Sequence, residues 1–403
     1  MVLVSIMFAM GFADFGIGNG LINAVSEAYG KDDRPLAREY VTSALVMMLG
    51  IAAVLAVAGA AGYPFVPWMR LFNVKSEAVA EAGARAFLVL YCWFVVSIPL
   101  GVVTRAQTGL QQGYVSQIVG ATGNIVSLLA LLLVIHLRGS LALLVFASTF
   151  GIAVANVLNG WVLFRKHPWL LPSWHAYRGR AASKILKLGL MFFVLQCAMA
   201  VSFTSDNIVI AQVLGAAAVA AYAVPQKLFS FVSMVIGMAS APLWPAYGEA
   251  IARGDVAWVR RVFIASLSVT LAISLPLYTI LALAGPWILR VAVGKSLQAP
   301  TSLLVVLAVW GVVYTVSVVI GMLLNGAGVL KMLAIASVFA SLSNLALSIF
   351  LTRRLGVMGV CLGSIISQLL ITLPTCLVLI RNLFKKLAEP KMGTSPETAA
   401  YLA

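Results

Sequence analysis

The sequence predicts an all-α, polytopic membrane protein built from two helical lobes in parallel repeat, and three observations carry this prediction. Hydrophobic residues make up 62% of the 403-residue chain and charged residues only 10%, whereas a soluble domain carries roughly 25% charged residues. The apolar residues fall into runs of about 20–30, each long enough to cross a ~30 Å hydrocarbon core as a helix. The second half of the chain also repeats motifs of the first half.

Each long apolar run is predicted to be a helix, because backbone polar groups in lipid must be satisfied within their own segment. In chain order, eleven such spans lie near 1–26, 40–62, 86–109, 115–137, 141–164, 188–212, 217–245, 262–289, 299–323, 331–352 and 357–381. The connections between them are short, apart from 63–85 and 165–187. This leaves no room for a sizeable soluble domain.

The basic residues predict the orientation of the helices, since cytoplasmic loops carry an excess of Lys and Arg. Alternate connections together with the C-terminal tail hold 18 of the 27 basic residues, the opposite connections hold 8, and Lys227 lies inside a span. We therefore expect a cytoplasmic C-terminus, with Met1 on the outer side. The net charge of +15 follows from this topology and from anionic lipid headgroups, so no nucleic-acid partner is expected.

An internal repeat predicts how the helices are grouped. The segment "EAYGKDDRPLAREYV" at 27–41 resembles "PAYGEAIARGDVAWVRRVF" at 245–263, and "LQQGYVSQI" at 110–118 takes the place of "LNGAGVLKM" at 324–332. An even number of spans in each unit makes the two copies parallel. The second copy opens with the span near 188–212, whose partner would precede Met1. We therefore expect a six-plus-six architecture in which this chain lacks the first helix of the first lobe.

This grouping predicts four regions along the chain. They are an N-terminal lobe of about five transmembrane helices at 1–165, a cytoplasmic linker at 166–187, a C-terminal lobe of six transmembrane helices at 188–385 and a cytoplasmic tail at 386–403.

Three stretches carry a family resemblance. They are "FADFGIGNGLINAVSEAYGKDD" at 12–33, "SDNIVIAQVLGAAAVAAYAVPQKL" at 205–228 and "LNGAGVLKMLAIASVFASLSNLALSIFLTRRLGVMGVCLGSIISQLL" at 324–370. They resemble polysaccharide-type transporters of the multidrug/oligosaccharidyl-lipid/polysaccharide exporter superfamily, in which an Asp, a Gly and a Tyr recur at about the spacing seen in the second stretch. The three matches cover about a quarter of the chain, and their order and spacing agree with the family's helix plan.

The resemblance implies a transporter and no enzyme. The family's O-antigen and exopolysaccharide branch flips polyprenyl-pyrophosphate-linked oligosaccharides across the bacterial inner membrane, by alternating access to a central cavity, during lipopolysaccharide and other surface polysaccharide biosynthesis. The implied partners are the lipid-linked oligosaccharide, membrane lipids, a proton or sodium ion and a polysaccharide polymerase. No cofactor is implied.

The cationic and amide residues within spans are candidates for substrate binding, because ionisable groups in lipid are costly and mark functional sites. Lys227 lies near the middle of its span, and Arg105 lies near an inner helix end. A guanidinium suits a substrate pyrophosphate, although Arg105 can also reach the interface by snorkelling. Gln107 and Asn207 offer amides to sugar hydroxyls, but such amides more often link helices.

Two carboxylates within spans are candidates for ion coupling. Asp14 lies deep in the first span and is either a proton or sodium site or a helix–helix hydrogen-bonding residue. Asp206 lies on the same hairpin as Lys227, so we expect the two to pair across the turn. That pair is either a structural ion pair or a device that holds and releases the lysine for substrate.

The other motifs argue against enzymes and metal sites. The four cysteines show no C-x-x-C spacing, and "GKS" at 294–296 lacks the glycine that a P-loop needs at 289. Gly16, Gly18 and Gly20 lie in an apolar run and predict close helix packing. The inner loop 165–187 has no Asp or Glu, which excludes a membrane glycosyltransferase with acid and base residues in that loop. A multidrug cation antiporter of the same superfamily is the remaining alternative, and it would need carboxylates where the flippase needs cations.

Overall fold

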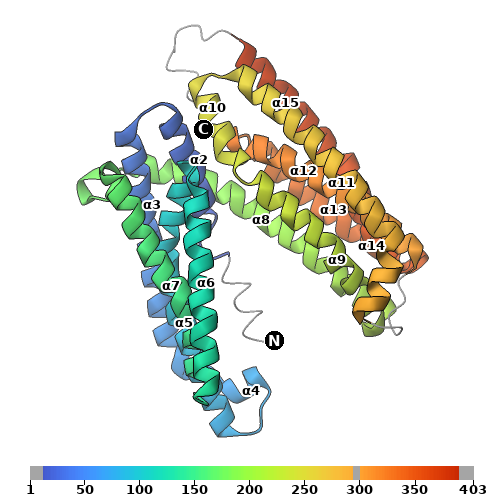
Figure 1. Ribbon diagram of the computed structural model, residues 1–403, viewed down its shortest axis with the longest axis horizontal. Helices are drawn as coiled ribbons and strands as arrows, with labels where there is room; N and C mark the ends of the chain where they lie inside the picture. Colours follow the sequence, from blue (N-terminus) through green and yellow to red (C-terminus); the bar gives the residue numbers. More distant parts are fainter. Residues whose placement is uncertain (1–11, 294–299, 390–403) are drawn as a thin grey trace. The chain divides into compact units, whose positions relative to one another are not determined.

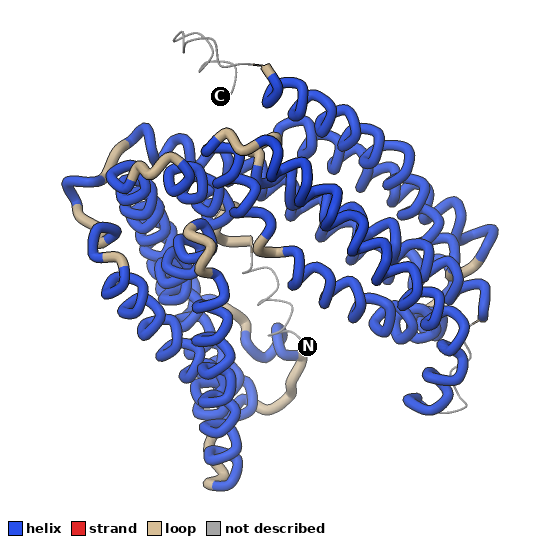
Figure 2. The backbone as a smooth tube through the Cα atoms, turned by 45° about the horizontal axis from the view of Figure 1, so that its top comes forward, coloured by secondary structure: helices blue, strands red, loops and turns tan. Residues whose placement is uncertain are grey.

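The computed structural model describes residues 12–293 and 300–389, and these ranges are almost entirely helical (Figures 1 and 2). Within them, ten helices are long and apolar enough to cross a membrane, which confirms the predicted all-α membrane fold. The eleventh predicted span, near 1–26, extends into residues that lie outside the described ranges. No β-strand occurs in the described part of the chain.

The chain divides into two compact units, and the division falls between Ala198 and Met199. Helix α8 (Gly179–Leu214) contributes its first part to unit 1 and its second part to unit 2. This helix begins at Gly179, earlier than the predicted start near 188. Lys184 and Lys187 therefore belong to α8 and not to a loop.

Unit 1 contains the elements that precede and open α8. They are α2 (Ile17–Gly30), α3 (Arg34–Gly62), η1 (Tyr63–Phe65), α4 (Trp68–Phe72), α5 (Glu77–Gly109), α6 (Gly113–His136), α7 (Leu141–Lys166), η2 (Pro168–Leu170) and η3 (Trp174–Ala176). Its core forms around α2, where Leu21 and Val25 are fully buried together with Val41 of α3 and Ile185 of α8. Short α2 is thus the central element of this unit, and longer helices surround it.

Small residues allow α2 and α8 to pack backbone against backbone. A Cβ atom at Gly20 would lie 2.5 Å from the carbonyl oxygen of Ile185, and one at Gly16 would collide with Gly189. These contacts confirm the predicted packing role of two of the three glycines. Gly18 differs, because its missing side chain makes room for the polar side chains of Asp14 and Arg105 instead of another helix.

We predict that Gly20→Ala lowers the free energy of unfolding by about 1–3 kcal/mol, because the added methyl group overpacks a contact between two backbones. Gly50→Ala is the matched control, since nothing lies within 4 Å of a Cβ at Gly50. That change should leave stability unchanged or raise it by up to ~1 kcal/mol, the ordinary gain of alanine over glycine in a helix. Thermal unfolding of the purified variants measures both, and equal melting temperatures would contradict the packing argument.

One prediction about unit 1 is wrong. The span near 1–26 was expected to be a continuous helix, but residues 12–16 form turns and α2 starts only at Ile17. Phe15 and Gly16 have φ angles of 47° and 71°, in the left-handed region that a right-handed helix cannot accommodate. Asp14 therefore lies in a turn, where its Oδ1 accepts a hydrogen bond from the backbone N–H of Gly16 at 2.9 Å. Aspartate commonly closes turns in this way.

Unit 2 contains the second part of α8 and the elements that follow it. They are α9 (Ala216–Ser240), α10 (Leu243–Arg253), α11 (Val256–Val293), α12 (Thr301–Gly326), α13 (Lys331–Leu355), α14 (Met358–Ser367), η4 (Gln368–Thr372) and α15 (Leu373–Ala388). Tyr222, Phe229 and Tyr278 lie in its core, with the last two rings stacked 6.1 Å apart. The unit is held together by aromatic packing between α9, α11 and α12.

The last predicted span, near 357–381, is a helix with a π-helical turn in it. Residues Gln368–Thr372 form this turn between α14 and α15, and Pro374 follows directly in the first turn of α15. Proline has no N–H to donate, and its ring clashes with the carbonyl four residues earlier, here that of Leu370. This accounts for the wider turn just before it.

Candidate functional site

In unit 1, three polar side chains gather around Gly18. Arg105 of α5 is half-buried, and its Nη1 donates a hydrogen bond to Oδ1 of Asn19 in α2 at 3.1 Å. The position that a Cβ of residue 18 would take lies 2.8 Å from Nε of Arg105 and 2.9 Å from Oδ2 of Asp14. The structure therefore brings together one predicted substrate-binding residue and one predicted ion-coupling residue.

The charge of Arg105 is not held in a close ion pair. None of the ion pairs among the described residues involves this guanidinium, so Asp14 lies near it without a direct salt bridge. A half-buried guanidinium with spare N–H groups is suited to bind an anion, and phosphate is the anion that its planar fork matches best. This cluster places a guanidinium that makes no ion pair among the described residues next to the carboxylate of Asp14.

Gln107 does not join this cluster. Its side chain is 1% exposed, and it exchanges two amide hydrogen bonds of 2.8 Å with Asn159 of α7. Ser116 of α6 donates a third hydrogen bond to it. The Gln107 amide therefore ties three helices together inside the unit and is not accessible to a sugar hydroxyl here.

In unit 2, Asp206 of α8 lies in a buried cluster between α8, α9 and α14. Its Oδ2 accepts a hydrogen bond from the hydroxyl of Tyr222 at 3.0 Å, and Sγ of Cys361 lies 3.8 Å from the same hydroxyl. Asp206 is only 5% exposed, and its Oδ1 has no hydrogen-bond partner among the described residues. The Oδ1 atom of half-buried Asn207 is likewise buried and unpartnered there.

The predicted pair between Asp206 and Lys227 is wrong. Tyr222 and Lys227 both lie on α9 but are five positions apart, so they point about 140° away from each other around the helix. Because Tyr222 faces Asp206, Lys227 points elsewhere and is exposed. No ion pair of the described residues includes it.

The structure adds a half-buried, ion-paired carboxylate that sequence reasoning missed. Glu27 at the end of α2 lies 2.6 Å from Nζ of Lys31 and 2.7 Å from Nζ of Lys184, and Lys184 also lies over the ring of Tyr40. Burial raises the pKa of Glu27, but the two lysines lower it more, so this pKa is below its usual value. The pair with Lys31 has the i, i+4 spacing that the sequence displays, whereas the contact with Lys184 depends on the tertiary fold.

Other missed residues are Asn19 and Tyr222, the direct partners of Arg105 and Asp206. Tyr222 is the tyrosine of the Asp, Gly and Tyr spacing noted in the sequence, so its signal was present. Asn19 had no sequence signal beyond its position among glycines. No group of three or more His, Cys, Asp or Glu that could hold a metal ion occurs in residues 12–293 and 300–389.

Two family models match this chain. Residues 1–251 match the family model described as "Polysaccharide biosynthesis protein", which is more than half of the chain. The chain belongs to this polysaccharide biosynthesis protein family. Residues 192–350 also match the MatE family model, while no curated protein matches.

Solved structures show the fold that this polysaccharide biosynthesis family member shares. A MATE transporter in complex with MaD3S has a TM-score of 0.82 at 17% identity, covering 96% of this chain and 88% of its own. An outward-facing multidrug resistance MATE transporter of the MOP superfamily has a TM-score of 0.80 at 16% identity, with the same coverage.

A third solved structure is a MOP superfamily transporter from Pyrococcus furiosus Vc1. It has a TM-score of 0.80 at 15% identity and again covers 96% of this chain and 88% of its own. It is described as having a binding pocket of reverse polarity that suggests a different function. The predicted family is confirmed by the model match over residues 1–251, and the solved structures show that the chain shares the fold of MOP superfamily transporters.

Proposed function

We propose that this transporter flips a polyprenyl-pyrophosphate-linked oligosaccharide across the bacterial inner membrane by alternating access, as a step in O-antigen, lipopolysaccharide or exopolysaccharide biosynthesis. In this proposal the C-terminus is cytoplasmic, and a polysaccharide polymerase receives the flipped product. The observation that carries the proposal is Lys227, an exposed ammonium in the middle of the apolar helix α9.

An ammonium at this position needs water or an anion beside it. Placing a lysine at the centre of a bilayer costs at least about 2.5–3.5 kcal/mol, and Lys227 has no ion-pair partner in the described part of the chain. Its face of α9 therefore suits a wet transport path. A pyrophosphate passing along that path would gain charge-assisted hydrogen bonds from Lys227.

Within unit 1, Arg105 supplies a cationic contact that also suits a pyrophosphate headgroup. Its guanidinium is half-exposed and is held by Asn19, so its position is fixed before substrate arrives. Asn207 is a further candidate contact for the glycan, because its amide oxygen has no partner among the described residues. Gln107 is left out of the proposed site because its amide is engaged inside unit 1.

Asp206 and Asp14 are the proposed ion-coupling groups. A carboxylate as buried as that of Asp206, with one unpartnered oxygen, is stable when it binds a proton or a cation such as sodium. Asp14 lies beside the Arg105 cluster, so a cation bound at this carboxylate would change the charge that a substrate anion meets. Both groups can therefore couple an ion gradient to headgroup binding.

The MatE match over 192–350 favours a second candidate, a multidrug cation antiporter. A cationic drug needs an accessible carboxylate, but Asp206 is almost fully buried and already accepts a hydrogen bond from Tyr222. The exposed charge of α9 is a cation, which repels such a substrate. The description of the Pyrococcus furiosus transporter supports the use of pocket polarity as the criterion, and here polarity favours an anion.

Transport by the purified chain in proteoliposomes tests the proposal. One set of vesicles carries a short-chain polyprenyl-pyrophosphate oligosaccharide, and flipping is read from its accessibility to an added glycosidase. A second set measures accumulation of a cationic dye. We expect accelerated flipping without dye transport, whereas dye transport without flipping would establish the antiporter instead.

A further inference from the structure

Positive charge is concentrated at the connection between α7 and α8 and in the helix turns that flank it, where Arg178 and Lys184 are paired with Glu39 and Glu27. Residues 165–187 contain six basic residues and no Asp or Glu. Lys166 is exposed at the end of α7, and Arg34 from the first turn of α3 lies 5.7 Å from the ring centroid of Trp169. Between them lies His167, whose pKa is lowered by burial and by the neighbouring charges of Lys166 and Arg34.

Two carboxylates are near this cluster in the chain, and one is already engaged. Asp33 accepts a hydrogen bond from the backbone N–H of Leu36 and so caps α3, which leaves exposed Asp32 as the other acidic residue of that turn. No ion pair of the described residues involves Arg34 or Lys166. The guanidinium of Arg34 and the ammonium of Lys166 are therefore free to contact an anion, while Asp32 and Asp33 keep their own negative charges beside Arg34 in the chain.

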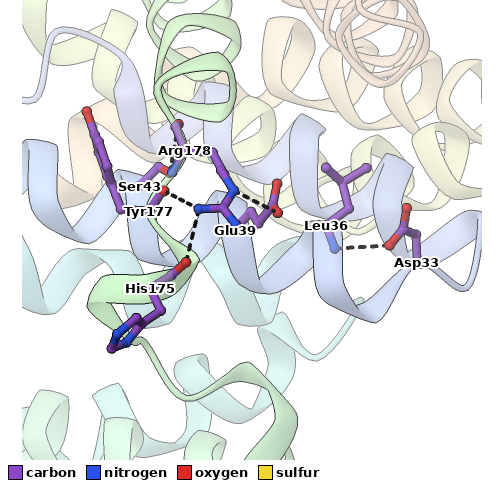
Figure 3. A network of polar contacts seen from close by, with 7 residues as sticks. All are labelled: Asp33, Leu36, Glu39, Ser43, His175, Tyr177 and Arg178. Atoms are coloured by element: carbon purple, nitrogen blue, oxygen red, sulfur yellow. Dashed lines mark hydrogen bonds and ion pairs between the residues drawn. The ribbon is translucent and has the colours of Figure 1, made fainter.

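The connection is fixed to α3 instead of hanging free. Nε of Arg38 donates to the carbonyl oxygen of Leu171 at 2.7 Å, and Leu170 is fully buried. Figure 3 shows the second attachment, where the Arg178 guanidinium reaches Glu39 at 3.6 Å and donates to the carbonyl oxygen of His175 at 3.1 Å. The connection is thus attached to α3 near both of its ends, and Arg34 lies over the ring of Trp169 within it.

The same fixed segment exposes large apolar side chains. Trp174 is 78% exposed, and Leu171 and Tyr177 are also exposed. Aromatic residues next to basic ones are typical of segments that lie at the boundary between headgroups and acyl chains. A free phosphate in water would use the cations alone, so the exposed tryptophan and leucine point to a ligand that also has an acyl region.

We propose that the α7–α8 connection binds the headgroup of an anionic phospholipid, with the lipid phosphate held by Arg34 and Lys166 and with Trp174 and Leu171 lying against its acyl chains. Each basic side chain near an anionic membrane surface contributes about 1 kcal/mol. The site lies wholly within unit 1 and does not depend on the transported substrate, so its failure and the failure of the proposed function are distinguishable.

Native mass spectrometry of the full chain, titrated in detergent with phosphatidylglycerol or phosphatidylcholine, tests the proposal. The double variant Arg34→Gln with Lys166→Gln should retain phosphatidylglycerol at least about tenfold more weakly, since two contacts of ~1 kcal/mol are lost. The control is the double variant Lys75→Gln with Arg85→Gln, which also removes two positive charges but at a different place in unit 1. Arg85 lies 3.5 Å from Glu81. That control should bind phosphatidylglycerol as the parent does.

A second variant addresses the apolar half of the site. Trp174→Ser changes a side chain that is 78% exposed, so folding should be unaffected and lipid retention should fall. Melting temperatures measured without added lipid check that all variants are folded. Equal phosphatidylglycerol retention by both double variants, equal retention of the two lipids by the parent, or displacement of phosphatidylglycerol by an equal concentration of inorganic pyrophosphate would overturn the proposal.

Discussion

Replacement of Lys227 by alanine is expected to reduce oligosaccharide flipping by about 10- to 100-fold. A hydrogen bond to a charged group contributes about 1.5–3 kcal/mol, and each 1.4 kcal/mol changes an equilibrium tenfold. Because Lys227 is exposed and makes no ion pair among the described residues, its removal leaves no buried partner behind. The loss should therefore appear in transport and not in stability. The proteoliposome assay and export of surface polysaccharide by a complemented flippase mutant both measure it.

Two variants control for this result. Lys227→Arg keeps a cation at the same position and should retain most of the activity, apart from the change in headgroup geometry. Ser230→Ala alters an exposed side chain about one turn further along α9, without changing charge, and should flip normally. Normal polysaccharide export by Lys227→Ala would rule out this residue as the headgroup contact.

Replacement of Asp206 by asparagine should make transport insensitive to ion gradients. Asparagine has nearly the same shape and can still accept the hydrogen bond from Tyr222, but it cannot bind and release a proton. We expect the ratio of rates with and without a gradient to fall about tenfold, within the range of coupling between linked sites. Proton and sodium gradients imposed separately on proteoliposomes measure this ratio and identify the ion.

Cys361→Ser is the matched control for that experiment. Its Sγ lies 3.8 Å from the Tyr222 hydroxyl, so the substitution changes the same cluster without changing its charge. The gradient response should survive. A full gradient response in Asp206→Asn would show that the carboxylate has only a structural role.

Much of the fold could be predicted from composition, because every span in lipid must satisfy its backbone polar groups within a helix. Ten of the predicted spans correspond to helices of the described residues that are long and apolar enough to cross a membrane. The turn at residues 12–16 was not readable, since an apolar run contains no signal that Phe15 takes a left-handed conformation. The early start of α8 was also hidden, because its first turns carry basic residues that resemble a loop.

The sequence identified which residues could form the candidate site but not which of them contact one another. Hydropathy located Asp206 and Lys227 inside spans, yet their pairing depends on the rotation of α9 relative to α8. That rotation is set by the tight turn at Gly215 and by packing of Tyr222 in the core. Similarly, nothing in the sequence indicates that Arg105 is partly exposed while Gln107, two positions later, is buried. One helical turn has residues on both its exposed and its buried side.

A native thiol can report on the buried cluster of Asp206, Tyr222 and Cys361. Cys92 is exposed, whereas Cys361 is buried next to the Tyr222 hydroxyl. A membrane-permeant maleimide should therefore reach Cys361 only when α9 and α14 separate. The rate of that alkylation, followed by mass spectrometry in different ionic media, reads out how often the Asp206 environment opens without any engineered label.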